Sequence, residues 1–175
     1  RGNRLRILMY HSIADNPRDP HSVSPSLFER QMAALGDGGS RVVSLQDGLR
    51  AAQERLSLKG HIVLTFDDAY RDFAEHAWPI LQRYRLPATL FVPTAFPEDP
   101  ARTFWWDRLY NSVMFTTRRD DLHTPLGLLR LDTATARAGT FKRLKVHVKS
   151  LPHHEALAWI NHLCAELGAV PSSAA

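Results

Sequence analysis

Polar residues at two places in the sequence are candidates for catalysis, because each directly follows a run of apolar residues. Asp67 and Asp68 follow residues 62–66, and His11 follows residues 6–10. Adjacent carboxylates repel one another, and a divalent cation relieves that repulsion. One carboxylate would ligate the metal while the other takes a proton from a water molecule. The doublet therefore indicates metal-assisted hydrolysis as one possible chemistry.

Both features also have structural interpretations. Two aspartates in front of a helix can serve as its N-cap and favour its dipole. On the doublet alone this interpretation is as good as the catalytic one, and the strictly apolar strand before Asp67 favours function. His11 is either an ordinary hydrogen-bonded loop residue or a pocket residue that contacts an active-site carboxylate or the substrate.

The elements that would position these residues alternate between strands and helices. Apolar runs predict buried strands over 6–10, 42–45, 62–66 and 88–92. Helical spacing predicts helices over 25–35, 45–56 and 74–84, the first with Ser24 as N-cap and Pro25 at its first position. This alternation predicts α/β architecture with a parallel sheet or barrel. Parallel strands end at one edge, so we expect His11 and Asp67 within about 10 Å of each other.

Beyond residue 95 the pattern becomes helical. Apolar spacing predicts helices over 104–115, 141–148 and 154–167, and no strand is expected there. We therefore predict two parts. Residues 1–95 form the N-terminal part of the α/β fold, and residues 96–175 form an α-helical insertion or cap.

Composition excludes several classes of protein. The chain has 175 residues, a net charge of +4 and one cysteine, Cys164, which rules out a disulfide within the chain and a cysteine-built zinc site. No apolar run approaches the length of a transmembrane segment. The cations Lys142, Arg143, Lys145 and Lys149 can share one helix face, as a solvated surface or as a contact for an anionic partner. No aromatic residues interleave with a basic stripe, so nucleic-acid binding is not expected.

Three segments, in the correct order, resemble polysaccharide deacetylases, the NodB-homology domains of carbohydrate esterase family 4. Residues 62–68 (IVLTFDD) resemble the first motif of that family. Residues 9–12 (MYHS) resemble the opening strand of the branch that includes the poly-N-acetylglucosamine deacetylases, and residues 86–94 (LPATLFVPT) resemble the strand that follows. Residues 105–107 (WWD) resemble a tryptophan-rich insertion of some members.

The resemblance implies a distorted (β/α) barrel and metal-dependent removal of acetyl groups from a polysaccharide, most naturally an N-acetylhexosamine polymer. By position it makes Asp67 the general base, Asp68 a ligand of a divalent metal, usually zinc, and His11 a pocket residue. The family's His-[Ser/Thr]-x-x-His motif, which supplies two further metal ligands, is not found. Ala69 stands where the family usually has glycine, and a positive φ there would cost alanine about 1 kcal/mol.

The missing histidine pair leads us to expect an N-terminal fragment that is truncated before the rest of the barrel and is not an active deacetylase by itself. Two alternatives stay open. One is a carbohydrate-binding relative without catalysis. The other, less favoured because no Gly-rich phosphate loop is present, is a magnesium-dependent phosphotransferase. The expected partner is a polysaccharide or oligosaccharide substrate. The resemblance suggests the bacterial cell envelope, periplasmic or extracellular, and leaves the cytoplasm open.

Overall fold

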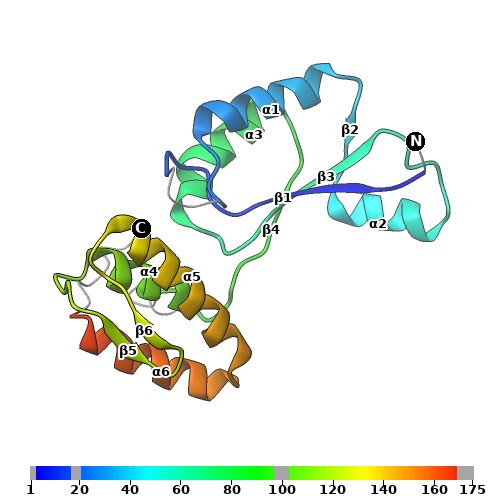
Figure 1. Cartoon of the computed structure of the whole chain (residues 1–175). Coiled ribbons are helices and arrows are strands. Elements are labelled where there is room, and N and C mark those ends of the chain that lie inside the picture. Colours follow the sequence, from blue (N-terminus) through cyan, green and yellow to red (C-terminus); the bar gives the residue numbers. More distant parts are fainter. Residues whose placement is uncertain (1–2, 17–20, 97–102, 169–175) are drawn as a thin grey trace. The chain divides into compact units, whose positions relative to one another are not determined.

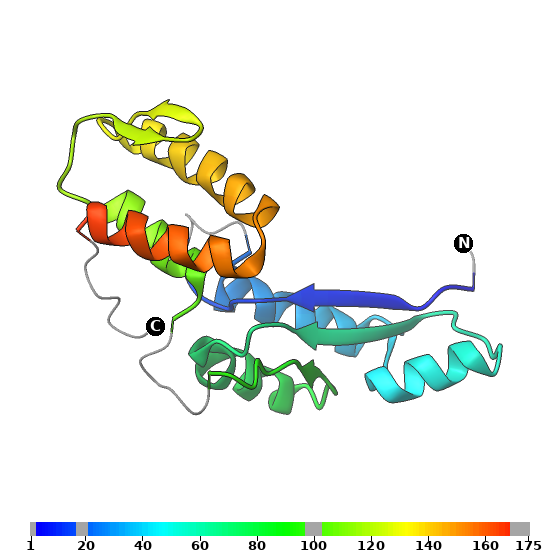
Figure 2. The same cartoon turned by 90° about the horizontal axis from the view of Figure 1, so that it is seen from below.

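The computed structural model describes residues 3–16, 21–96 and 103–168. The chain divides into two compact units, Arg1–Thr94 and Ala95–Ala175, each with its own hydrophobic core. The first unit contains β1 (Arg6–Tyr10), α1 (Pro25–Asp37), β2 (Arg41–Val42), α2 (Leu45–Gln53), β3 (His61–Phe66), the π-helical turn η1 (Phe73–Ala77), α3 (Trp78–Arg83) and β4 (Thr89–Leu90). The second contains α4 (Trp105–Phe115), β5 (Leu122–Thr124), β6 (Gly127–Leu129), α5 (Ala134–Ser150) and α6 (His153–Glu166), as Figures 1 and 2 show.

The first unit is built around a parallel sheet with β3 at its centre. β1 pairs along one side of β3, with Ile7 opposite Val63 and Tyr10 opposite Phe66. On the other side, β2 pairs with the start of β3 and β4 pairs with its end. The parallel α/β arrangement predicted from the alternation of elements is therefore confirmed for these strands.

Helices cover both faces of β3, which explains why this strand is apolar throughout. Ile62, Leu64 and Phe66 pack against α1 and α3 in the core of the first unit. On the opposite face, Gly48 of α2 lies against Val63. Figure 1 shows the same division, with α1 and α3 on one side of the β1–β3 pair and α2 on the other. β3 is thus held rigidly up to its last residue.

Short-range signals set the helix starts in the first unit. The Ser24 hydroxyl accepts a hydrogen bond from the Leu27 amide, and Pro25 occupies the first turn of α1, as predicted. The Ser44 hydroxyl likewise accepts from the Asp47 amide at 3.1 Å and donates to the Asp47 carboxylate at 2.7 Å. These bonds satisfy amide groups that the first turn of a helix leaves without partners.

The prediction that β1 is a buried strand is wrong for most of its side chains. Ile7 and Met9 are 50% and 60% exposed, and within β1 only Tyr10 is buried. In the described sheet β1 lies at an edge and has a neighbouring strand on one side only. An apolar run indicates a strand, but it does not show whether that strand lies at the centre of a sheet.

Several predicted elements also differ in length from those observed. The strands predicted over 42–45 and 88–92 each pair over two residues only, as β2 and β4. The helix predicted over 45–56 ends at Gln53, and the one predicted over 74–84 begins with the π-helical turn η1. Element ends depend on pairing partners and caps that lie outside the apolar pattern.

The second unit consists of three helices that pack on one another and a β-hairpin. β5 and β6 pair antiparallel with Leu122 opposite Leu129, which contradicts the prediction that no strand occurs beyond residue 95. Each strand is only three residues long, too short to show an alternating pattern, and Pro125 breaks the apolar run at the turn. The core gathers residues from all three helices and the hairpin: Leu109, Val113, Leu122, Leu129, Leu131, Leu144, Val148, Ile160, Leu163 and, as predicted, Cys164.

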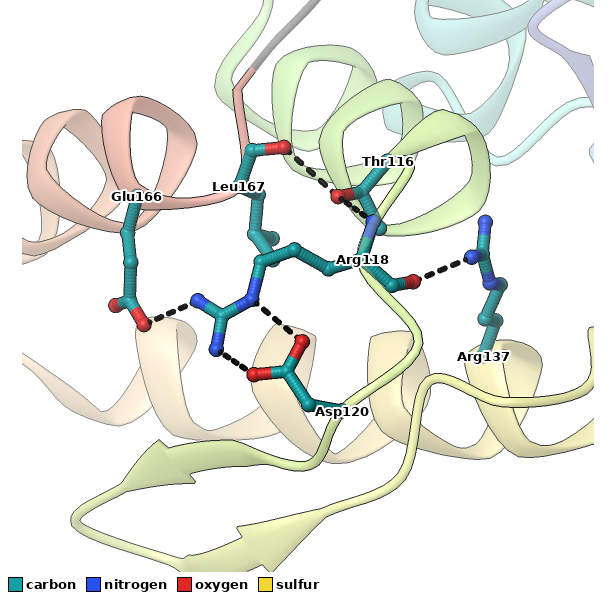
Figure 3. Close-up of polar contacts among 6 residues, drawn as sticks. All are labelled: Thr116, Arg118, Asp120, Arg137, Glu166 and Leu167. Carbon is teal, nitrogen blue, oxygen red and sulfur yellow. Dashed lines mark hydrogen bonds and ion pairs between the residues drawn. The ribbon is translucent and has the colours of Figure 1, made fainter.

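Two arginines tie the segment between α4 and β5 to the rest of the second unit (Figure 3). Arg118 donates to the Asp120 carboxylate at 2.6 Å and to the Glu166 carboxylate at 2.7 Å. Arg137 is buried, and its guanidinium donates to the carbonyl oxygens of Leu131, Met114 and Arg118 at 2.7–2.9 Å. A buried charge needs such partners, and here backbone carbonyls supply them in place of a carboxylate.

Across the described part of the chain, no helix combines the length and the apolar character that crossing a membrane requires.

Candidate active site

The register between β1 and β3 brings His11 and Asp67 together. Tyr10 pairs with Phe66, and the Asp67 amide donates to the Tyr10 carbonyl at 2.9 Å, so the residues after both strands emerge at one edge of the sheet. His11 Nε2 lies 4.0 Å from Asp67 Oδ2. The predicted proximity of these two side chains, more than fifty residues apart in sequence, is confirmed.

The chain turns sharply directly after Asp67. Asp68 and Ala69 both adopt left-handed backbone conformations, with φ of 69° and 49°. Such conformations are unfavourable for residues with a Cβ, and glycine adopts them readily. The positive φ considered for Ala69 is thus confirmed, and the turn that holds the acidic pair is strained.

The surroundings of Asp68 disfavour its negative charge. Partial burial raises the pKa of the Asp68 carboxyl, the electrostatic influence of His11 lowers it, the neighbouring Asp67 raises it again, and His21 lowers it. The net result is a raised pKa. A cation beside Asp68 would stabilise the ionised form, because opposite charge offsets both desolvation and the repulsion from Asp67.

The acidic pair does not cap a helix. The following helical segment begins at Arg71, four residues after Asp67, and continues into η1 at Phe73. The interpretation of Asp67 and Asp68 as an N-cap is therefore wrong. Their carboxylates lie at the end of the sheet, where sites in parallel α/β folds form.

A second His-Ser pair, which the sequence analysis did not assign to the site, lies beside the first. Ser12 and Ser22 form a parallel bridge, the Val23 amide donates to the Ser12 carbonyl at 3.0 Å, and the two hydroxyl oxygens are 3.3 Å apart. The imidazole rings of His11 and His21 are 5.2 Å apart. The repeated His-Ser dipeptide was the one sequence signal that could have indicated this pairing.

Tyr10 anchors the end of β1 under the site. Its ring stacks on Phe66 with centroids 5.3 Å apart, and its hydroxyl donates to Gln31 Oε1 at 3.0 Å. Burial raises the pKa of the Tyr10 phenol, so this group stays protonated and keeps donating. The backbone that carries His11 is therefore fixed by packing and by a hydrogen bond.

The described residues do not by themselves fit a complete catalytic metal site. Within residues 3–16, 21–96 and 103–168, no group of three or more His, Cys, Asp or Glu side chains is arranged to hold a metal ion. Catalytic zinc sites generally use three protein ligands and keep a fourth position open. Asp68 therefore stays a predicted ligand without an assembled partner set.

Comparison with known proteins supports a deacetylase assignment. Residues 56–112, which include Asp67 and Asp68, match the family model for polysaccharide deacetylase. The chain is 33% identical over 90 residues to YxkH of Bacillus subtilis, a protein named provisionally as a polysaccharide deacetylase. This match covers 51% of this chain and 32% of YxkH. It is 30% identical over 94 residues to the poly-beta-1,6-N-acetyl-D-glucosamine N-deacetylase of Staphylococcus aureus, covering 54% of this chain and 32% of that protein.

A solved structure is similar as well. The Streptococcus pyogenes deacetylase PplD, in complex with acetate, has 32% sequence identity and a TM-score of 0.50, and the alignment covers 61% of this chain and 50% of PplD. The resemblance predicted from the motifs is confirmed as a similarity: part of this chain is similar to polysaccharide deacetylases, which are hydrolases. The aligned segments span about a third of the length of the two curated relatives.

Proposed function

We propose that this chain carries part of the active site of a metal-dependent polysaccharide deacetylase that acts on an N-acetylhexosamine polymer. The observation that carries the proposal is the 4.0 Å approach of His11 to Asp67 at the carboxyl ends of two paired parallel strands. Asp67 lies inside the segment that matches the deacetylase family. The name of the Staphylococcus aureus relative supports the polymer class, and the acetate bound to PplD is the acid that deacetylation releases.

In this proposal Asp67 is the general base. Its carboxylate takes a proton from a water molecule, whose oxygen then bonds to the carbonyl carbon of the acetyl group. The carbon–nitrogen bond breaks, acetate leaves, and the sugar nitrogen takes up the proton as an amine. His11 Nε2 lies 4.0 Å from Asp67 Oδ2, close enough to hold that carboxylate in position.

We further propose Asp68 as one ligand of a divalent metal, zinc by analogy with the family, whose histidine ligands are not among the described residues. The raised pKa of Asp68 supports this role, because burial and the neighbouring Asp67 disfavour the negative charge of its carboxyl and a cation would offset both.

We also propose an overall fold, and the exposed edge strand β1 supports it. We infer that the parallel strands belong to a distorted (β/α) barrel and that residues 96–175 are an α-helical insertion or cap. The exposed apolar side chains of Ile7, Leu8 and Met9 on β1 support this, because a closed barrel surrounded by helices would cover both faces of β1.

The test is acetate release from poly-N-acetylglucosamine, together with metal content, by a protein in which this chain is joined to the family's histidine ligands. Asp67→Asn should lower the rate by about 100-fold or more, the range for loss of a general base, and leave metal content nearly unchanged. Asp68→Asn should lower both the rate and the metal content. Loss of metal in Asp67→Asn with full activity in Asp68→Asn would reverse the two roles.

Two other results would replace the proposal. Binding of the polymer without acetate release would favour a carbohydrate-binding relative that lacks catalysis. Release of phosphate from a sugar phosphate in the presence of magnesium, with no acetate release, would favour a phosphotransferase.

A further inference from the structure

The outer face of α5 is strongly basic. Lys142, Arg143 and Lys149 are exposed and Lys145 is half-buried, while Leu144 and Val148 of the same helix are buried in the core of the second unit. The four cations therefore share the face that points away from the core. From residue 133 to residue 154 the sequence contains no aspartate or glutamate. We call this set of four cations the α5 basic face.

These charges are not neutralised within the described structure. Among the described residues, none of the four cations forms an ion pair: Arg143 donates to the Leu126 carbonyl at 3.0 Å, and Lys145 Nζ lies 5.6 Å from the centre of the Phe141 ring. Like charges three and four residues apart repel each other on a helix. A cation in the last turn, such as Lys149, favours the helix dipole, but Lys142 and Lys145 are too far from the helix end for that explanation.

Two hollows lie along this helix, and both combine cations with apolar groups. One, of about 450 Å³, is lined by Leu126, Lys142, Arg143, Val146, His147 and Ser150. The other, of about 240 Å³, includes Trp105, Lys149 and Leu157 in its lining. Val146 is 65% exposed, so an apolar contact surface is available between the charges.

We propose that the α5 basic face binds a linear anionic polysaccharide, with one carboxylate or phosphate per repeat unit. Such a chain presents negative groups at regular intervals, and Lys142, Lys145 and Lys149 follow one another at about 5 Å along the helix axis. Between its charges a sugar ring presents C–H groups, which fit against Val146 and Leu126 in the larger hollow. The indole of Trp105 offers a flat apolar surface beside Lys149.

The structure favours this partner over a membrane or a nucleic acid. A helix that binds at a membrane surface inserts a continuous apolar face, whereas the apolar residues Leu144 and Val148 of α5 are committed to the core. Recognition of single-stranded nucleic acid relies on several aromatic stacking platforms along a basic groove, whereas the larger hollow is lined by no Phe, Tyr or Trp and by a single imidazole, that of His147. The proposal concerns a surface of the second unit and does not depend on the deacetylase activity.

The test is the affinity of the 175-residue chain for polygalacturonate, which has a carboxylate on every sugar, compared with neutral dextran. We expect binding of polygalacturonate at low ionic strength, weakening toward about 0.15 M salt as the charges are screened, and no binding of dextran. The triple variant Lys142→Gln/Lys145→Gln/Lys149→Gln should bind about tenfold more weakly or worse. The triple Lys→Arg variant at the same positions should keep its affinity.

A matched control separates this site from net charge. Arg30→Gln/Arg50→Gln/Lys59→Gln removes the same charge from exposed positions of the first unit and should leave the affinity unchanged. Circular dichroism checks that both triple variants keep their helices. The proposal is overturned if polygalacturonate does not bind at low salt, or if the two triple variants lose affinity equally. It is also overturned if phosphatidylglycerol vesicles or a DNA duplex bind more tightly than polygalacturonate.

Discussion

The hydroxyl of Ser12 donates a 2.6 Å hydrogen bond to Oδ2 of Asp72, sixty residues further along the chain. Ser12 directly follows His11, and Asp72 closes the loop that begins with Asp67 and Asp68, so this bond joins the two loops that carry the candidate catalytic residues. The other oxygen of Asp72, Oδ1, is buried and has no hydrogen-bond partner among the described atoms. Among the described residues, the Ser12 hydroxyl is therefore the hydrogen-bond donor that compensates the burial of the Asp72 carboxylate.

Removing the Ser12 hydroxyl should destabilise the first unit. Ser12→Ala leaves a partly buried carboxylate without this donor, and the free energy of unfolding should fall by about 1–3 kcal/mol. Urea denaturation followed by circular dichroism measures the change. Ser57→Ala, at an exposed position, is the control and should change the free energy of unfolding little. Equal effects of the two substitutions would mean that the bond contributes nothing specific.

A substitution in the strained turn after β3 should stabilise the protein, in contrast to Ser12→Ala. Ala69 has a φ of 49°, which glycine adopts without strain, so Ala69→Gly should raise the free energy of unfolding by about 1 kcal/mol. Ala34→Gly, on the exposed side of α1, should lower it by about 1 kcal/mol, because glycine is a poor helix former. Thermal denaturation of the two variants should therefore shift in opposite directions. Destabilisation by Ala69→Gly would show that the turn has no strain to relieve.

The part of the fold that could be predicted from the sequence rests on strong local signals. β3 is apolar because helices cover both of its faces, and the acidic pair directly after it marks the strand end. The Ser24–Pro25 pair marks the start of α1 in the same local way. With parallel strands established, the proximity of His11 and Asp67 follows from topology, and the structure confirms it.

The parts that could not be predicted depend on contacts between distant segments. The exposure of Ile7 and Met9 is set by the position of β1 at a sheet edge, which its composition does not encode. The β5–β6 hairpin consists of two three-residue strands, and pairing rather than propensity defines them. The approach of His21 to His11 depends on the bridge between Ser12 and Ser22, and the repeated His-Ser dipeptide alone does not specify that the two segments pair.

The His11–Asp67 pair gives a kinetic prediction that rests on the proposed deacetylase function. His11→Gln removes the imidazole next to the base, and kcat should fall by about 10–100-fold, as for loss of a residue that orients an active-site group. KM should change little if His11 acts on Asp67 rather than on the substrate.

His21 provides the comparison for that measurement. Its ring lies 5.2 Å from the His11 ring and its side chain is exposed, so if His11 acts through Asp67, His21→Gln should change kcat less than His11→Gln does. A larger effect at His21, or a loss expressed only in KM at His11, would assign substrate contact rather than orientation of Asp67 to this histidine pair.

Packing between α2 and β3 leaves no room for a side chain at Gly48. A Cβ there would lie 2.9 Å from Val63 Cγ2 and 3.1 Å from a methyl group of Leu5, so Gly48→Ala should destabilise the first unit by about 1–3 kcal/mol through overpacking. Gly139 of α5 has nothing within 4 Å of the corresponding position. Gly139→Ala should instead stabilise the second unit by about 1 kcal/mol through helix propensity. Differential scanning calorimetry of the two variants tests both signs.

The second unit should depend on Arg137 more than on any single ion pair at its surface. The buried Arg137 guanidinium donates to three backbone carbonyls, of which Figure 3 shows that of Arg118, and Arg137→Ala would leave these acceptors without their donors. At about 1–3 kcal/mol for each buried acceptor, the loss should reach about 3 kcal/mol or more. Arg119→Ala, at an exposed neighbouring position, should stay within about 0.5 kcal/mol of the parent.

Arg137→Lys separates charge from geometry, because lysine keeps the charge but lacks the planar fork of donors that reaches three carbonyls at once. Full stability of Arg137→Lys in urea would show that the charge alone suffices, and full stability of Arg137→Ala would show that water can replace the guanidinium.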